Sequence, residues 1–132
     1  MCLDFGSRHV GVAITDVDGE LALRYSVIDR KKDDVLDEVE AIVEEEDVAK
    51  IVVGVPRSLS GEESEQTHAS LSFIEDLRER LPAMPVDEAD ETFTTVEAER
   101  VIAEEGGKQE EAHAEAARLM LESYLQDRKS VV

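Results

Sequence analysis

The stretch LDFGSRHVGVAITD, residues 3–16, decides the fold of this chain. An apolar segment leads to Asp4, a tight turn begins at Gly6, and a second apolar segment covers residues 9–15. Two apolar segments joined by a short glycine turn predict a pair of strands. Because Asp4 stands at the end of a buried strand, we expect its carboxylate to be held rigidly. Gly6 and Gly11 would let the backbone approach a bound phosphate closely.

Strand and helix patterns alternate along the rest of the chain. The Asp18-Gly19 pair predicts a hairpin turn into a third strand. The unbroken apolar run at 50–55 predicts a central strand covered on both faces, and Pro82 and Pro85 bracket a further short strand. The predicted strands are 1–5, 9–15, 20–28, 50–55 and 84–90, and the predicted helices are 33–47, 64–80, Thr94 to the Gly106-Gly107 pair, and 109–127.

This order, β-β-β-α-β-α-β-α-α, predicts an α/β fold of the RNase H-like kind. We expect a mixed five-stranded sheet with helices on both faces and residues 1–5 in its central strand. The length of 132 residues fits one domain over 1–132. No apolar run approaches the ~18 residues that span a membrane, and the N-terminus shows a strand pattern instead of a signal peptide. The single cysteine, Cys2, fits a reducing compartment, so we expect a cytoplasmic protein.

The charge balance is strongly acidic, with 33 acidic and 14 basic residues and a formal net charge of −19. Self-repulsion of this size weakens a small fold at low ionic strength, and salt near 1 M screens it within ~3 Å. The acids spread over predicted helix faces, as they do along 33–46. We interpret this as halophilic adaptation to a salt-rich cytoplasm. The alternative is an ordinary acidic protein that avoids nucleic acid or binds a basic partner.

Four segments, in this order and spacing, resemble the YqgF/RuvX family over nearly the whole chain. They are LDFGSRHVGVAITD (3–16), IVVGVPRSLSGEESEQ (51–66), DETFTTVEAE (90–99) and LMLESYL (119–125). Members of that family are RNase H-like nucleases, described as Holliday junction resolvases and as pre-16S ribosomal RNA processing nucleases. The resemblance implies a metal-dependent enzyme that hydrolyses phosphodiester bonds in structured nucleic acid.

Three side chains are expected to meet at one site: Asp4, Glu91 and His113. Two carboxylates brought together require a positive charge between them, and a divalent metal is the economical candidate. Glu91 matches the catalytic Glu of the family's D-E-R-x-T-T motif, although Thr92 stands where the family has Arg. His113 stands where the family has an Asp near the start of the last helix. The resemblance thus implies Asp4, Glu91 and His113 as catalytic and metal-binding residues, with two Mg²⁺ or Mn²⁺ ions.

His113 is the least regular of the three positions. Neutral imidazole suits Mn²⁺ or Zn²⁺ better than Mg²⁺. If the last helix were shifted in register, Glu110 or Glu111 would take its place. The alternatives to a ligand are a core histidine satisfied by a hydrogen bond, or a site that has lost its activity.

The resemblance also implies substrate contacts in two loops near this site. Arg8 and Arg57 could reach phosphates, as such loops do in the family, although surface salt bridges are the alternative for both. The remaining predicted substrate-binding residues are Gly6, Ser58 and Gly61, with Ser60 in the same loop. His9 and His68 show no partner in the sequence, so we expect them to be solvated or bonded locally.

Two functions of different classes therefore remain open. The first is the metal-dependent nuclease, whose partner would be a ribosomal RNA precursor or branched DNA. The second is a catalytically degenerate module of the same fold that binds nucleic acid or protein, suggested by Thr92, His113 and the shortage of basic surface. We expect no membrane partner, and the sequence leaves the choice between monomer and homodimer open.

Overall fold

The computed structural model describes residues 1–56, 64–90 and 94–130. Its strands are β1 (Cys2–Phe5), β2 (His9–Thr15), β3 (Ala22–Asp29), β4 (Ile51–Val55) and β5 (Val86–Asp90). Its helices are α1 (Val35–Glu45), α2 (Glu65–Arg80), α3 (Thr94–Glu105) and α4 (Ala112–Ser130). A short 3₁₀ turn, η1 (Gln109–Glu111), precedes α4. The last helix therefore begins at Ala112 and not at 109 as predicted.

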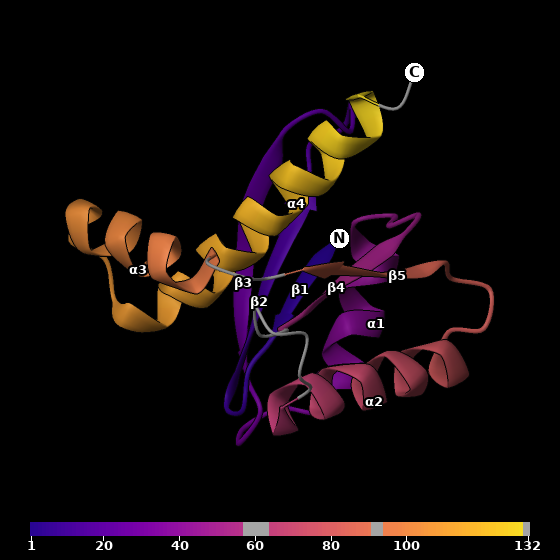
Figure 1. Cartoon of the computed structure of the whole chain (residues 1–132). Coiled ribbons are helices and arrows are strands. Elements are labelled where there is room, and N and C mark those ends of the chain that lie inside the picture. The colour runs from indigo at the N-terminus through magenta and orange to yellow at the C-terminus, as the bar shows by residue number, and fades with distance from the viewer. Residues whose placement is uncertain (57–63, 91–93, 131–132) are drawn as a thin grey trace.

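The five strands form one mixed sheet in the order β3-β2-β1-β4-β5, with β1 in the centre (Figure 1). β1 pairs antiparallel with β2, and β2 pairs antiparallel with β3. β4 pairs in parallel with β1 and with β5. The predicted mixed sheet with a central first strand is thus confirmed, and helices cover both of its faces.

One face of the sheet carries the larger apolar core, beneath α1 and α2. Alternate residues of β1, Leu3 and Phe5, point to this side because side chains along a strand alternate between faces. They meet Val39 of α1 and Ile74 of α2 in one buried cluster. The cluster continues through the sheet with Val10, Val12, Ile51, Val53 and Val55. Branched and aromatic side chains thus fill the space between the sheet and these two helices.

The opposite face is covered by α4, which runs along β1, β2 and β3 (Figure 1). Small side chains dominate this contact: Ala13 of the sheet lies against Ala117, together with Cys2 and Met120. The small side chains let the helix axis come close to the sheet. α3 packs against α4, with Ala98 and Ile102 in their shared cluster, and Figure 1 shows α3 to the side of the sheet.

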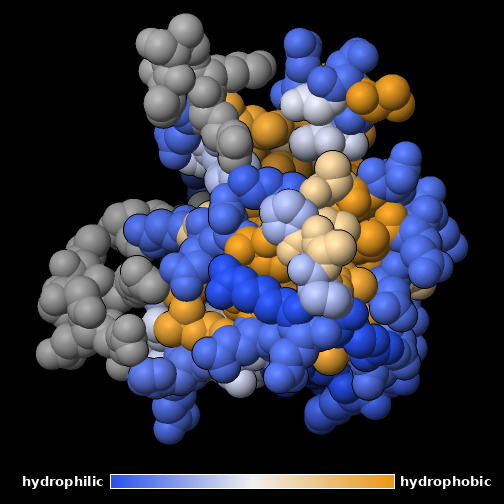
Figure 2. Space-filling model, turned by 90° about the vertical axis from the view of Figure 1, so that its right-hand side faces the viewer, coloured by the Kyte–Doolittle hydropathy of each residue, from blue (hydrophilic) through white to orange (hydrophobic). Residues whose placement is uncertain are grey.

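The edge strand β5 is polar. Asp87, Glu88 and Asp90 of this edge strand are exposed. Charged side chains on an edge strand discourage pairing with other chains. Figure 2, which views the molecule from the right-hand side of Figure 1, shows mainly hydrophilic side chains with apolar atoms visible between them. None of the helices in the described part of the chain is long and apolar enough to cross a membrane.

The predicted hairpin between β2 and β3 is present and is closed by Asp16. Its carboxylate accepts hydrogen bonds from the backbone N–H groups of Glu20 and Leu21, at 2.9 and 3.1 Å. These two bonds hold the pKa of Asp16 below its usual value. Gly19 adopts a φ of 70°, a left-handed conformation that glycine accepts without a steric cost. The Asp18-Gly19 signal therefore predicted the turn, and Asp16 stabilises it.

Candidate active site

Asp4 lies in the middle of the sheet, on the face that α4 covers. Its register partners are Gly11 on β2 and Gly54 on β4. Both neighbours in the sheet therefore lack a side chain that could cover the carboxylate of Asp4. Its side chain is only 9% exposed. The local sequence thus holds one carboxylate at a fixed and largely buried position.

The first turn of α4 brings His113 to this carboxylate. The Nδ1 atom of His113 lies 3.7 Å from Oδ2 of Asp4, and the imidazole is 36% exposed. Close packing at Gly11 makes this possible: a Cβ on Gly11 would lie 1.9 Å from the carbonyl oxygen of His113 and 2.7 Å from the nitrogen of Ala114. Gly11 therefore admits the backbone of α4, a role different from the phosphate approach that the sequence suggested.

A second histidine, His9, extends the site, and the sequence reasoning missed it. The rings of His9 and His113 lie 5.3 Å apart between centroids and are tilted by 33°. The Nε2 atom of His9 lies 3.8 Å from Oε2 of Glu110 in the 3₁₀ turn. The register contained the signal: His9 lies two residues before Gly11, so both face α4 on the same side of the sheet as Asp4.

The turn at Gly6 closes one side of the site. Its backbone N–H donates to the carbonyl of His9 at 3.0 Å. A Cβ on Gly6 would lie 2.6 Å from that carbonyl oxygen and 3.6 Å from Cε1 of His113. A side chain at this position would therefore clash with the backbone carbonyl of His9 and would touch the ring of His113.

Arg8 lies on the outer side of the same turn. Its Nη2 atom is 3.4 Å from Oδ2 of Asp29, and its side chain is 51% exposed. The backbone N–H of Lys31 and the guanidinium of Arg8 together hold the pKa of Asp29 below its usual value. The structure thus shows a surface ion pair for Arg8, and its contact with phosphate stays a prediction.

Several predicted site residues lie outside the described residues: Arg57, Ser58, Ser60, Gly61, Glu91 and Thr92. Their neighbours in sequence are placed. Asp90, which precedes Glu91, pairs with Val55 at the ends of the parallel strands β5 and β4. The start of α2 is bonded to the same end of the sheet, because Gln66 donates to the carbonyl of Phe5 and Thr67 donates to that of Pro56. Parallel strands thus end beside the strand that carries Asp4.

An ion cluster around the buried Glu115 anchors α4 two residues after His113. Glu115 is fully buried, and it accepts hydrogen bonds from Arg24 of β3 at 2.8 Å and from Arg118 at 2.5 and 2.8 Å. Arg24 also forms two hydrogen bonds with Glu105 at the end of α3. Burial alone would raise the pKa of Glu115, but the donors of Arg118 and Arg24 outweigh it and lower the pKa. The cluster thus ties β3, α3 and α4 together.

The donor atoms present suit a divalent ion only in part. Asp4 offers a carboxylate oxygen and His113 an imidazole nitrogen, and both are metal ligands. Within the described ranges, no three His, Cys, Asp or Glu side chains are placed to hold one ion. Glu91, the third predicted ligand, directly follows Asp90 but is not among those residues. The described site is therefore a pair of donors, and β4 separates the strand of Asp4 from β5.

Comparison with known proteins gives many relatives of similar length. A protein of Phocaeicola vulgatus is 31% identical, covering 99% of this chain and 97% of the relative. One of Fusobacterium nucleatum is 34% identical, covering 98% and 97%, and one of Desulforudis audaxviator is 38% identical, covering 98% and 95%. Each carries the name "Putative pre-16S rRNA nuclease".

Among solved structures, Pelota of Archaeoglobus fulgidus is similar to this chain in fold, with a TM-score of 0.51 and 13% identity. The similarity covers 98% of this chain and 34% of Pelota. At this identity it supports the fold alone. The family described as "RuvX: Holliday junction resolvase" matches residues 1–127. With this match and the identities of its relatives, the chain belongs to the RuvX family, whose fold is RNase H-like.

Proposed function

We propose that this protein is a divalent-metal-dependent nuclease that hydrolyses phosphodiester bonds in structured nucleic acid. The observation that carries the proposal is the pair Asp4 and His113, 3.7 Å apart on a glycine-lined part of the sheet. Precursor 16S ribosomal RNA is the favoured substrate because the relatives are named for it. Branched DNA is the alternative because the family description names the Holliday junction.

The pair fits a metal by its chemistry. A separation of 3.7 Å between Nδ1 and Oδ2 is compatible with both atoms binding one ion at the usual ~2.0–2.2 Å. A divalent ion held there would supply an acidified water and would neutralise charge on the phosphate. The imidazole nitrogen favours Mn²⁺ over Mg²⁺. Glu91 is the third expected ligand and would be needed for a second ion.

The residues of the chain would orient and shield the reacting groups. Asp4 presents its carboxylate from a strand fixed on both sides, so it loses little freedom on binding an ion. His113 is exposed enough for the scissile phosphate to approach. His9 packs against the ring of His113 and thereby limits the orientations that the ring can adopt.

The first test is cleavage by the parent and an Asp4→Asn variant. End-labelled precursor ribosomal RNA and a four-way DNA junction are incubated in about 1 M KCl with Mn²⁺, Mg²⁺ or a chelator. We expect metal-dependent cleavage by the parent and a loss of at least ~10³-fold in Asp4→Asn. Asp76→Asn, the same change on an exposed residue of α2, is the matched control. Equal activity of Asp4→Asn and the parent would exclude the proposal.

A second test concerns the choice of metal. Replacing His113 by Asp supplies an oxygen donor where the parent has a nitrogen donor. Because Mg²⁺ prefers oxygen ligands and imidazole suits Mn²⁺, His113→Asp should raise the ratio of Mg²⁺-supported to Mn²⁺-supported cleavage. His113→Ala should weaken binding of both ions. A metal ratio unaffected by either change would remove His113 from the ligand set.

The alternative function is a binding module that has lost its catalysis. It is favoured by two departures from the family pattern, Thr92 in place of Arg and His113 in place of Asp. Calorimetric titration with Mn²⁺ separates the two functions. Binding in the micromolar range that disappears in Asp4→Asn supports the nuclease, and the absence of binding supports the module.

We also propose that the protein works in a salt-rich cytoplasm. The net charge of −19 is spread over exposed helical surface, including most acids between 33 and 46. Such charge destabilises the compact state unless salt screens it. The free energy of unfolding should rise between about 0.1 and 1 M KCl, as measured by urea titration followed by circular dichroism. Stability independent of KCl would favour an ordinary acidic protein.

A further inference from the structure

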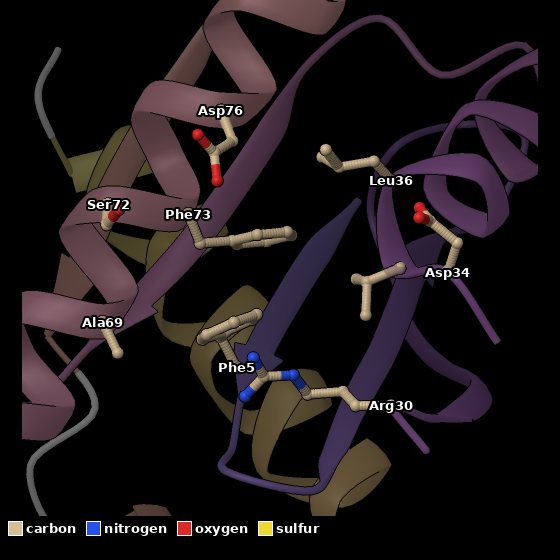
Figure 3. Close-up of a pocket in the computed structure, with 9 residues that line it drawn as sticks. Phe5, Arg30, Asp34, Leu36, Ala69, Ser72, Phe73 and Asp76 are labelled. Atoms are coloured by element: carbon tan, nitrogen blue, oxygen red, sulfur yellow. The ribbon is translucent and has the colours of Figure 1, made fainter. Parts of the chain in front are cut away.

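Arg30, the residue after β3, is held in a fixed position beside the site. Its guanidinium lies over the ring of Phe5, 4.4 Å from the centroid. Phe5 in turn stacks on Phe73 of α2, with ring centroids 4.2 Å apart and planes 15° apart. Figure 3 shows the guanidinium of Arg30 against the side chain of Phe5, with Phe73 on the other side of that ring. Stacking on an aromatic face orients an arginine without using its N–H groups.

The hydrogen bonds of Arg30 leave one edge of its guanidinium available. Nη1 donates to the carbonyl of Gly6 at 2.9 Å and to that of Ser7 at 3.0 Å. Nε and Nη2 have no hydrogen-bond or carboxylate partner among the residues that the structure describes. Arg24 and Arg118, by contrast, are each bound to two carboxylates. Arg30 thus keeps a free two-donor fork at the surface.

This fork lies on the α1–α2 side of the sheet, and the Gly6 turn separates it from the Asp4 site on the α4 side. The carbonyl of Gly6 accepts from Arg30, and the Cα of Gly6 faces the ring of His113 closely enough that a Cβ there would lie 3.6 Å from Cε1. One turn residue therefore separates Arg30 from His113. A polymer bound at the site would pass within reach of Arg30.

Three other basic residues surround Arg30, and together the four form what we name the Arg30 patch: Arg8, Arg30, Lys31 and Lys32. All four are exposed. The backbone N–H of Arg30 donates to the carbonyl of Arg8 at 2.8 Å, which fixes the two chain segments side by side. The patch holds four of only 14 basic residues in a chain of net charge −19.

Nearby acids are largely occupied within the protein. Asp29 accepts from Arg8 and from the backbone N–H of Lys31. Asp34 accepts from the N–H of Asp37 as the cap of α1. Beside Phe5, a shallow groove of about 350 Å³ is lined by Arg30 but also by Asp34 and Asp76 (Figure 3). These two carboxylates would repel an anion, so a phosphate chain would avoid the groove and cross the turn.

We propose that the Arg30 patch binds the phosphodiester backbone of the substrate next to the bond that is cut, with Arg30 gripping one phosphate through Nε and Nη2. This role depends on the proposed nuclease function, because it assigns a contact to the same substrate. A planar fork of two N–H donors matches two phosphate oxygens. The contact positions the chain without reading its sequence, so it would serve RNA and DNA alike.

Binding can be measured apart from cleavage by using Asp4→Asn protein. Fluorescence anisotropy with a labelled RNA hairpin that carries a single-stranded tail, and with a four-way DNA junction, gives Kd between about 50 and 400 mM KCl. Adding Arg30→Gln should raise Kd about 10-fold and make the slope of log K against log salt shallower by about one. Arg30→Lys should keep the slope and lose part of the affinity, because the charge remains and the fork is gone. Both ligands should lose affinity to a similar extent, because the contact is made to phosphate.

Arg100→Gln provides the matched control. It removes the same charge from an exposed arginine of α3 that pairs with Glu104. Circular dichroism in the same buffers, and Mn²⁺ titration of Arg30→Gln in the parent background, check whether Arg30 acts only by holding the Gly6 turn. The proposal requires weaker nucleic-acid binding with an unchanged melting temperature and unchanged Mn²⁺ affinity. An equal effect of Arg100→Gln, or parallel losses of binding, folding and metal affinity, would overturn it.

The outcomes also separate this proposal from the nuclease function. If the parent cleaves and Arg30→Gln does not weaken binding in the Asp4→Asn background, the proposed role of the patch is excluded and the nuclease function is supported. If the parent does not cleave but binding depends on Arg30, the nuclease function is excluded and Arg30 remains a contact of a nucleic-acid-binding module. If the protein with Arg30 unchanged binds neither the RNA nor the DNA ligand, the proposed role of the patch is excluded.

Discussion

The two faces of the sheet are built from the same strands yet differ in kind. β1 sends Leu3 and Phe5 to the side of α1 and α2, where branched and aromatic residues fill the space. The same strand sends Asp4 to the side of α4, where Gly11 and small alanines line the contact. The α1–α2 face contains most of the buried apolar surface. On the α4 face, the small residues let α4 approach the sheet closely enough to reach Asp4.

The fold thus places most of its stabilising contacts on one face of the sheet and its chemistry on the other. A cavity or a lost contact on the α1–α2 face should lower the free energy of unfolding and leave the Asp4 site intact. A change on the α4 face should displace His113 even where little apolar area is lost. Substitutions on one face at a time can test this separation, and they are given from the largest expected effect to the smallest.

The largest effect is expected from Gly11→Val, on the α4 face. Even the first added carbon would fall 1.9 Å from the carbonyl oxygen of His113, and backbone cannot move aside as a flexible side chain can. We expect a loss of about 4 kcal/mol or more in the free energy of unfolding, together with the loss of Mn²⁺ binding and cleavage. Urea unfolding and calorimetry measure the two effects.

Val12→Ala is the control for Gly11→Val, because it alters the next residue on the opposite face. Val12 belongs to the apolar cluster beneath α1 and α2. Its truncation should cost about 1–2 kcal/mol and leave Mn²⁺ affinity unchanged. A folded Gly11→Val protein with the parent's metal affinity would show that the close approach of α4 is not required.

The second effect is expected from Phe73→Ala, on the α1–α2 face. Phe73 is 5% exposed and stacks on Phe5. Truncation of a buried aromatic ring costs about 3–4 kcal/mol, whereas Phe73→Leu should cost about 1 kcal/mol. In both variants that remain folded in molar salt, Mn²⁺ affinity should stay within about twofold of the parent. A large loss of affinity would mean that the two faces are coupled.

How far the sequence predicted these faces depends on the kind of signal. Strand alternation and helical spacing are local, so they predicted the sheet, its central strand and the helices on both faces. The prediction that Asp4 and His113 share one site depended on the family resemblance as well, because the resemblance supplied the register of α4. The 3₁₀ turn at 109–111 was missed, since its pattern does not differ from the helix that follows.

Long-range side-chain contacts were the part that local patterns could not supply. The ring contact of His9 with His113 joins residues far apart in sequence, and so does the bond between Arg24 and Glu115. Such contacts depend on which strand pairs with which and on how close a helix lies. For His9, the two-residue spacing from Gly11 would have predicted the correct face, although not the partner.

The third effect is expected from Glu115→Gln, which removes the charge that holds α4 to Arg24 of β3 and that also binds Arg118 of the same helix. The variant leaves two partly buried cations without their shared partner, and we expect a loss of about 2 kcal/mol after allowance for the water that reaches both arginines. Because the pKa of Glu115 is lowered in the folded state, its contribution is fully present above the unfolded pKa of about 4.3. It disappears as pH falls through the folded pKa.

Urea titrations of the parent and of Glu115→Gln between about pH 7 and pH 3 test this sign. The difference in unfolding free energy should be constant near neutral pH and should shrink in acid. Glu105→Gln alters the exposed member of the same cluster, whose side chain is 51% exposed, and should have a smaller effect. A difference that grows on acidification would contradict the lowered pKa of Glu115.

The smallest effect is expected from His9, because it acts on the ring of His113 and not on an ion directly. His9→Ala removes the ring contact and the partner of Glu110, and it should weaken Mn²⁺ binding about 10-fold, the usual size for a residue that orients a ligand. His9→Phe keeps a ring and should recover most of that loss if packing is what orients His113. The midpoint of urea unfolding of both variants should be nearly that of the parent, since His9 buries little apolar surface. Unchanged Mn²⁺ affinity in His9→Ala would mean that α4 alone fixes the orientation of the His113 imidazole. The close approach of α4 to the sheet at Gly11 would then be sufficient to form the metal site.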